Sequence, residues 1–129
     1  MKSETAEWID KAEGDWGTML RESEVLIHPN YDAVCFHAQQ CVEKYLKGRL
    51  IEADVPFRKT HDLLNLLEAL SHVEPDWKTY HQILSKLSIY GVAGRYPGLL
   101  SNQTQSKEAV EICREIRDIV RKSLGLFAA

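Results

Sequence analysis

An arginine and a tyrosine stand side by side in a glycine-rich segment, YGVAGRYPG, at residues 90–98. Its glycines let a backbone approach a ligand closely, and Pro97 favours an extended conformation at Tyr96. A guanidinium beside an aromatic ring suits recognition of a phosphate or a carboxylate, with the ring available for stacking. Arg95 and Tyr96 are therefore candidate ligand-binding residues. The structural alternative is that Arg95 pairs with an acid and Tyr96 fills the end of a helical bundle.

A second candidate set lies in CFHAQQCVEKYL, where His37, Gln40 and Lys44 recur at three- and four-residue steps. At 3.6 residues per turn these side chains form one polar stripe beside an apolar one. The simplest interpretation is a solvated helix surface, and Gln39 and Glu43, on the far side of the same polar surface, favour it. The competing hypothesis is that the stripe lines a groove shared with the glycine-rich segment.

The segment RKTHDL provides a third candidate site, because Arg58 and Lys59 stand just ahead of an expected helix N-terminus, which favours anions. Thr60 is a suitable N-cap, and Asp62 would fall in the first helical turn. An ordinary helix cap with charged loop residues explains the segment equally well. His61 and Asp62 alone make no metal-ligand set, and the sequence has no HExxH and no paired CxxC. We therefore expect neither a metal nor a cofactor.

These candidates must be positioned by helices, because no segment alternates apolar and polar residues as a strand does. Apolar residues recur at helical spacing within ranges separated by proline and glycine. The expected helices cover residues 3–27, 31–53, 60–71, 75–90 and 106–127. Long amphipathic helices joined by short loops predict an all-α, up-and-down four-helix bundle with an additional short helix.

Composition limits the classes of protein that need consideration. The chain has 129 residues, 44% hydrophobic and 27% charged, which predicts a single domain over residues 1–129. A net charge of −3 argues against a protein that coats nucleic acid indiscriminately. Three cysteines with no CxxC pair, no secretory leader and no membrane-length apolar run predict reduced, buried thiols in a cytoplasmic protein.

Three ordered stretches closely resemble the HEPN family: YDAVCFHAQQCVEKYLKGRL, then PFRKTHDLLNLL, then Tyr90 followed by GRYPG. In that family the second helix carries an FHAQQ-like segment followed by EK. The third helix begins with THDL, and a tyrosine and RYP follow the fourth. The ordered set spans essentially the whole chain, and it adds His61, Asp62 and Tyr90 to the candidate site.

The resemblance implies a four-helix bundle that is often dimeric. Many HEPN proteins are encoded beside a minimal nucleotidyltransferase and work with it, some as toxin and antitoxin. Others are nucleotide- or RNA-associated modules of larger proteins. A number of them are metal-independent ribonucleases that use an arginine and a histidine separated by four to six residues.

That ribonuclease motif is absent from its expected position, because no histidine follows Arg95 in the sequence. Arg21 and His28 have the spacing, but they lie at the junction of the first two helices, where a chance match is expected. The sequence therefore favours a protein that is not catalytic by itself.

Three functions remain open at this point. The leading hypothesis is an accessory protein that binds a nucleotide or a minimal nucleotidyltransferase partner through Arg95, Tyr96 and the polar stripe. The second is a ribonuclease toxin that pairs Arg95 with a histidine remote in sequence, either His37 or His61. In that mechanism a neutral histidine removes the ribose 2′-hydroxyl proton while the arginine stabilises the phosphorane. The third is a dimerising scaffold with the stripe as its interface.

Overall fold

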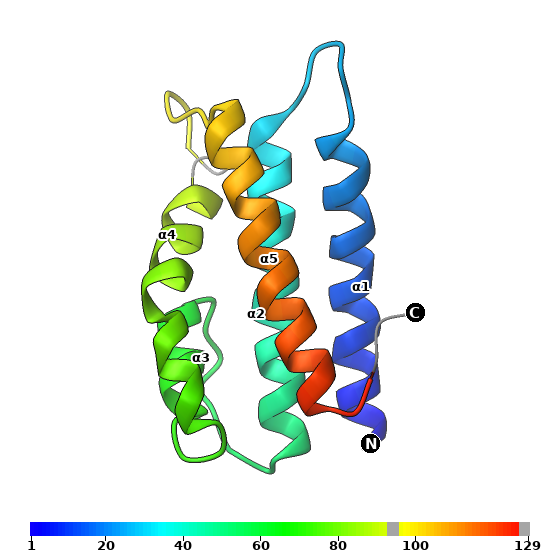
Figure 1. The fold of residues 1–129 in the computed structure, drawn as a ribbon, viewed down its shortest axis with the longest axis vertical. Coiled ribbons are helices and arrows are strands. Elements are labelled where there is room, and N and C mark those ends of the chain that lie inside the picture. Colours follow the sequence, from blue (N-terminus) through cyan, green and yellow to red (C-terminus); the bar gives the residue numbers. More distant parts are fainter. Residues whose placement is uncertain (93–95, 127–129) are drawn as a thin grey trace.

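The computed structural model describes residues 1–92 and 96–126, and this part of the chain is helical with no strand. The elements are α1 (Ser3–Ser23), α2 (Tyr31–Glu52), α3 (Leu63–Ala69), the 3-10 helix η1 (Pro75–Tyr80), α4 (His81–Val92) and α5 (Gln103–Ser123). In Figure 1, α1 and α4 run in one direction, α2 and α5 run in the other, and the short α3 lies beside α4. The predicted up-and-down bundle with one additional short helix is confirmed.

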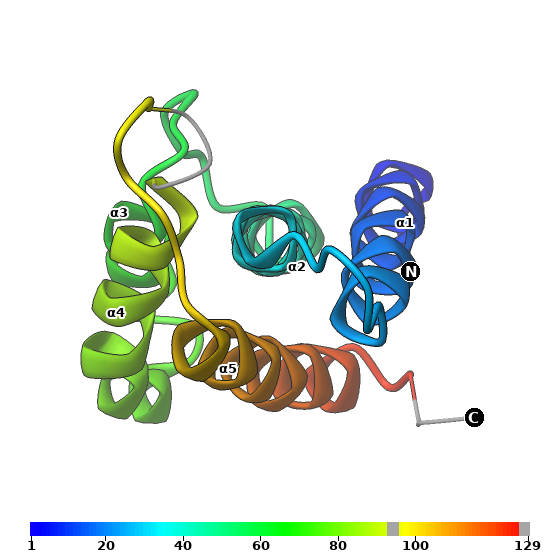
Figure 2. The same cartoon turned by 90° about the horizontal axis from the view of Figure 1, so that it is seen from above.

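Helix α2 is the centre of the bundle, because it packs against α1, α3, α4 and α5. Figure 2 shows it between α1 on one side and α3 with α4 on the other, while α5 covers a third side. The apolar stripe predicted for this helix is fully buried, at Val34, Ala38, Cys41, Val42, Tyr45 and Leu46. The three cysteines are buried free thiols, as predicted.

A charged network holds α1, α2 and α5 together on the side away from α3. Arg117 donates to both carboxylate oxygens of Glu13 at 2.7 and 2.8 Å, and the Tyr45 hydroxyl donates to the same carboxylate at 2.5 Å. Arg121 donates to that hydroxyl at 3.2 Å, and the Arg117 guanidinium lies 4.5 Å from the centre of the Trp16 ring. We call Glu13, Tyr45, Arg117 and Arg121 the Glu13 network.

The helix starts follow side-chain capping. Asn30 caps α2, accepting a hydrogen bond from the Ala33 amide at 3.0 Å. Helix α5 begins at Gln103, earlier than predicted, because Asn102 and Gln105 form a reciprocal capping box. At α3 the cap is Asp62 and not Thr60, because the Asp62 carboxylate accepts from the first helical amides while the Thr60 hydroxyl accepts from the amide of Asp62.

The predicted helices differ from the structure in length or type. Helix α3 is shorter than the predicted range 60–71, and α5 ends at Ser123, before the predicted end at 127. Helix α1 ends at Ser23, four residues before the predicted end at Ile27, and the connection passes through His28 with a left-handed φ of 53°. Leu26 therefore does not continue the buried stripe and is 93% exposed. Pro75 begins a 3-10 helix, and the α-helix expected from residue 75 starts only at His81.

Candidate ligand-binding site beside the Glu43 cluster

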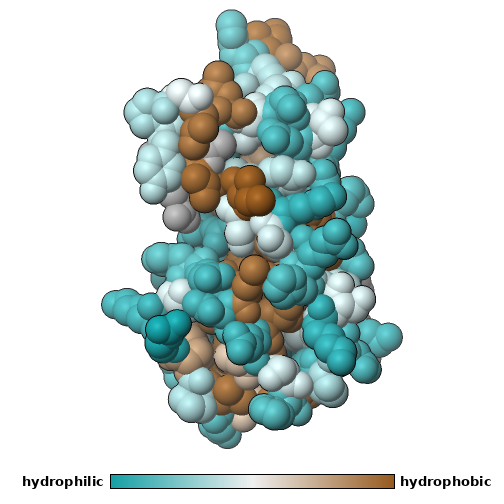
Figure 3. Space-filling model, turned by 90° about the vertical axis from the view of Figure 1, so that its left-hand side faces the viewer, coloured by the Kyte–Doolittle hydropathy of each residue, from teal (hydrophilic) through white to brown (hydrophobic). Residues whose placement is uncertain are grey.

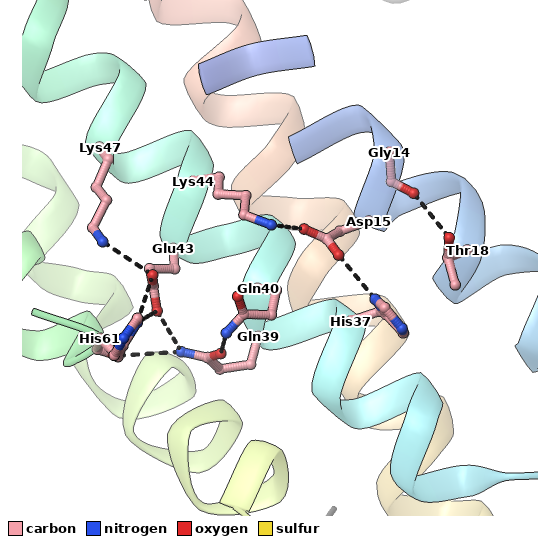
Figure 4. A network of polar contacts seen from close by, with 10 residues as sticks. All are labelled: Gly14, Asp15, Thr18, His37, Gln39, Gln40, Glu43, Lys44, Lys47 and His61. Carbon is pink, nitrogen blue, oxygen red and sulfur yellow. Dashed lines mark hydrogen bonds and ion pairs between the residues drawn. The ribbon is translucent and has the colours of Figure 1, made fainter. Parts of the chain in front are cut away.

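The polar stripe predicted on α2 is divided between two different sets of partners. His37 places Nδ1 2.8 Å from Asp15 of α1, and Lys44 forms an ion pair with the same carboxylate. Gln40 instead donates to the side-chain oxygen of Gln39 at 2.7 Å. Figure 4 shows His37 and Lys44 pointing to one side of the helix, away from Gln39, to which Gln40 donates. Two members of the stripe are thus engaged in holding α1 against α2.

The other side of α2 carries a buried acid, Glu43, with three partners. We call Glu43, Gln39, Lys47 and His61 the Glu43 cluster. Glu43 is 2% exposed, and Lys47 donates to its carboxylate at 3.1 Å. Nδ1 of His61 lies 3.0 Å from the same oxygen, and the Gln39 amide donates to the other oxygen at 3.2 Å. Gln39 also donates to the backbone carbonyl of His61 at 3.2 Å.

The expectation that Gln39 and Glu43 share a solvated surface is therefore wrong. Both are buried, because the segment that leads into α3 passes over this side of α2 and brings His61 onto Glu43. A buried carboxylate is tolerated only with charge and hydrogen-bond partners, and the cluster supplies a lysine, a histidine and an amide. The signal in the sequence was the spacing of 39, 43 and 47, which puts an acid and a base one turn apart on a single face.

His61 differs from the rest of the cluster in being accessible. Its side chain is 72% exposed, while its Nδ1 is held by Glu43. Among the described residues, its other ring nitrogen has no hydrogen-bond partner. A carboxylate on one nitrogen orients the ring and leaves the second nitrogen available to a ligand or a transferred proton. His37 is less accessible, at 27% exposed, and it faces Asp15.

A pocket of about 240 Å³ adjoins the cluster and reaches the end of α4. Its lining residues are Gln39, His61, Asp62, Ser88, Gly91 and Val92. We call this the α4-end pocket. Helix α4 approaches closely here, because a Cβ built on Gly91 would meet Gln39 side-chain carbons at 2.8 and 2.9 Å. Asp62 also lines the pocket, but its carboxylate is already engaged as the α3 cap, where it accepts from the Leu64 amide at 2.9 Å.

The remaining predicted site residues lie apart from this pocket or outside the described chain. Tyr90 donates its hydroxyl to Glu108 of α5 at 2.9 Å, and Lys86 pairs with the same carboxylate at 3.0 Å. Desolvation and the Glu108 carboxylate raise the pKa of Tyr90, while Lys86 lowers the pKa of Glu108. Tyr96 is 58% exposed, so it does not fill the end of the bundle. Arg95 lies outside the described residues, and its convergence with the α2 stripe stays a prediction.

Two further properties concern the same part of the chain. Within residues 1–92 and 96–126, no group of three histidine, cysteine or acidic side chains is placed to hold a metal ion. None of the helices described there combines the length and the apolar character needed to cross a membrane.

A family model described as the HEPN domain matches residues 5–123, which is nearly the full length of the chain. The chain belongs to the HEPN family. Comparison with curated proteins and with solved structures gave no match.

The structure brings together the segments that carry the HEPN resemblance. The FHAQQ segment contributes Gln39, the following EK contributes Glu43, and THDL contributes His61. Gln39 and His61 line the pocket together with Gly91, and Glu43 contacts both of them from beneath. The RYP segment follows Gly91 by four residues in the sequence. No one of these residues identifies the family by itself. Together they occupy one side of this HEPN bundle, around a buried acid and a pocket.

Proposed function

We propose that this HEPN protein binds a nucleotide at the α4-end pocket, either alone or together with a minimal nucleotidyltransferase partner. The observation that carries the proposal is the coincidence of an oriented, exposed His61 with a pocket that ends at Val92. Arg95 and Tyr96 follow Val92 by three and four residues in the sequence. A guanidinium and an aromatic ring are the groups that recognise phosphate and base.

The size of the pocket limits what can enter it. Pockets that enclose a drug-sized ligand usually measure roughly 300–1,000 Å³, whereas this one measures about 240 Å³. One part of a nucleotide, such as its base, is therefore expected inside. The phosphates would lie across the pocket mouth, and Arg95, three residues after Val92 in the sequence, is the residue proposed to bind them. The polar wall formed by Gln39, His61 and Asp62 would supply directional hydrogen bonds to the enclosed part.

Isothermal titration of the protein with each of the four ribonucleoside triphosphates, in EDTA, tests this proposal. We expect one nucleotide to bind, and His61→Ala and Arg95→Ala each to weaken it by roughly tenfold or more. His72→Ala is the matched control, because His72 is also exposed but lies beyond the end of α3. His37→Ala then shows whether the predicted stripe takes part. Failure of all four nucleotides to bind the protein would overturn the proposal.

A ribonuclease is the second candidate function, and one observation favours His61 over His37 as its histidine. A general base needs a free ring nitrogen within reach of its proton, and His61 offers one while Glu43 orients the ring. Incubation with mixed-sequence RNA in EDTA tests this activity. Cleavage that disappears in both Arg95→Ala and His61→Ala but persists in His37→Ala would establish a ribonuclease. Intact RNA with the wild-type protein would exclude it.

The partners in this proposal follow the family resemblance. We infer a homodimer in the cytoplasm that works with a minimal nucleotidyltransferase, in the manner of a toxin–antitoxin pair. Co-expression and co-purification with a nucleotidyltransferase encoded beside this chain tests that pairing. A non-catalytic scaffold remains the outcome if neither nucleotide, RNA nor nucleotidyltransferase binds. The polar stripe on α2 is a poor interface for such a scaffold, because His37 and Lys44 are already bonded to Asp15.

A further inference from the structure

The α4-end pocket has in its lining a hydroxyl group that no other part of the protein satisfies. Ser88 lies on α4 and lines the pocket, and its Oγ is buried with no hydrogen-bond partner among the described residues. Buried hydroxyls in proteins are normally paired, and an unpaired one lowers the stability of the fold. The adjoining pocket is where a partner for this hydroxyl can enter.

The other polar side chains of the lining offer acceptors. Gln39 has both amide hydrogens engaged, one with Glu43 and one with the backbone carbonyl of His61, so only its side-chain oxygen has capacity left. The Asp62 carboxylate caps α3 through a single oxygen, which accepts from the Leu64 amide. Its second oxygen has no hydrogen-bond partner among the described residues and is a free acceptor.

Glu43 determines the hydrogen-bonding character of His61. A carboxylate can only accept, so the proton of a neutral His61 ring lies on Nδ1, 3.0 Å from Glu43, and the accessible Nε2 is an acceptor. Gly91 and Val92 lie in the last turn of α4, where backbone carbonyls find no amide within the helix. Among the described residues that line the pocket, Ser88 thus supplies the one side-chain hydrogen that is not already engaged.

Apolar side chains are exposed at the same end of α4. Ile89 and Val92 are exposed near the end of the helix, and the exposed Tyr96 follows them in the sequence. Figure 3 faces the α4 side of the bundle and shows apolar side chains gathered on its upper part, where α4 ends. An apolar surface beside a set of acceptors suits a flat aromatic ring whose edge carries hydrogen-bond donors.

We propose that the α4-end pocket selects a base that carries an exocyclic amino group next to an unprotonated ring nitrogen, as adenine and cytosine do. The amino group donates to Nε2 of His61 and to the free oxygen of Asp62, and the Ser88 hydroxyl donates to the ring nitrogen. Uracil, guanine and hypoxanthine have a carbonyl and a protonated ring nitrogen at these positions, so an acceptor would face acceptors. The inference rests on the proposed function, because it takes nucleotide binding at this pocket as given and names the class of base.

Isothermal titration in EDTA with two pairs of nucleotides tests the selection. ATP and ITP differ at this edge of a purine, and CTP and UTP differ at the matching edge of a pyrimidine. At about pH 8, where a free imidazole is neutral, we expect ATP or CTP to bind and its carbonyl counterpart to bind roughly tenfold more weakly or worse. Equal affinity within a pair, or a preference for ITP, UTP or GTP, would overturn the inference and leave the proposed function standing. Absence of binding by every nucleotide would overturn both.

The same base can also be presented by RNA, and a second titration distinguishes the two sources. It compares the preferred free nucleotide with ribonucleotide tetramers of the preferred base and of its carbonyl counterpart. Tighter binding of the preferred tetramer than of the free nucleotide identifies RNA as the source, and the reverse identifies the nucleotide. The preference for the amino base is required in both cases, so tetramers that bind equally well would contradict the proposal.

Ser88→Ala is the sharper test of the arrangement, because binding and stability should respond in opposite directions. The affinity for ATP or CTP should fall by about threefold to tenfold. The midpoint of urea denaturation should stay the same or rise, since an unpaired buried hydroxyl has been removed. Ser85→Ala, one turn earlier on α4 and outside the pocket lining, is the matched control and should leave the affinity unchanged. A Ser88→Ala protein that binds as tightly as the wild type would overturn the role assigned to this hydroxyl.

Discussion

The Glu13 network and the Glu43 cluster each surround one carboxylate with partners on or beside α2. They differ in whether one of those partners is accessible to solvent. Glu13 receives two hydrogen bonds from Arg117 and one from Tyr45, all from residues that hold helices together. Glu43 is bound by Lys47 and Gln39 in the same way, but its third partner is His61, which is 72% exposed. The partners of Glu13 all join helices to one another, whereas the partners of Glu43 include an accessible histidine beside a pocket.

This difference indicates which cluster is structural and which is a candidate for function. Arg121 Nε in the Glu13 network is buried without a hydrogen-bond partner among the described residues. The carboxylate of that network, however, is bonded only to residues that join helices, and so it offers little to a ligand. The Glu43 cluster instead presents an oriented ring with one nitrogen unmatched among the described residues. Burial alone would raise the pKa of Glu13, but the hydrogen bonds from Arg117 and Tyr45 outweigh it and hold that pKa below 4.5. Glu13 is therefore kept ionised for its structural contacts.

Removal of the Glu43 carboxylate has the largest expected effect on stability. Glu43→Ala leaves the buried Lys47 ammonium without its ion-pair partner. Loss of one partner from a buried pair costs about 3–5 kcal/mol, because the remaining charge is uncompensated. The free energy of unfolding from urea denaturation measures the change. The double variant Glu43→Ala, Lys47→Met should recover most of it, and an unchanged midpoint in the single variant would show that Lys47 does not depend on this acid.

Glu13→Gln should have a smaller effect that depends on pH. At pH 7 the variant should lose about 1–3 kcal/mol, typical of hydrogen bonds to a charged group. Because the folded pKa of Glu13 lies below 4.5, its stabilising contribution is present above pH 4.5 and is lost as the pH falls through the folded pKa. The gap between wild type and variant should therefore narrow as pH falls below 4.5. Urea denaturation at neutral and acidic pH measures it, and a constant gap would contradict this role.

The two regions also differ in how far the sequence could predict them. The buried stripe of α2 and its Asn30 cap follow from spacing and side-chain chemistry within one helix. The burial of Glu43 depends on a segment almost twenty residues later that passes over it, so helical spacing alone assigned it to solvent. Long-range packing buries that residue, and the spacing of 39, 43 and 47 indicates only that the three side chains share one face of the helix.

The end of α1 shows the opposite error. Leu26 and Ile27 continue the apolar spacing of the helix, so periodicity predicted a longer helix. The chain must instead turn toward α2, and the two side chains remain exposed. An apolar pattern does not distinguish a core from an interaction surface. The glycine-rich segment was identified from residue types alone, and the position of Arg95 relative to the pocket stays a prediction.

Gly91→Ala tests the contact between the α4-end pocket and the Glu43 cluster. The added Cβ would meet Gln39 at less than 3 Å, so either α4 or the Gln39 side chain must move. Overpacking of this kind costs about 1–3 kcal/mol, and the displacement of Gln39 should also weaken nucleotide binding. Gly14→Ala is the matched control, because nothing lies within 4 Å of its added Cβ in the middle of α1. That change should be neutral or stabilise by up to about 1 kcal/mol.

His61→Ala should have the smallest effect on stability and a large effect on nucleotide binding. This combination distinguishes a cluster with an accessible ligand-binding residue from one that only holds helices together. The exposed ring leaves Glu43 still paired with Lys47 and Gln39, so the free energy of unfolding should change by about 0.5 kcal/mol or less. Urea denaturation and nucleotide titration of the same preparation measure both quantities. A loss of stability comparable to that of Glu43→Ala would mean that His61 is needed to satisfy the buried acid. The Glu43 cluster would then be structural in the same sense as the Glu13 network, and the contrast between them would fail.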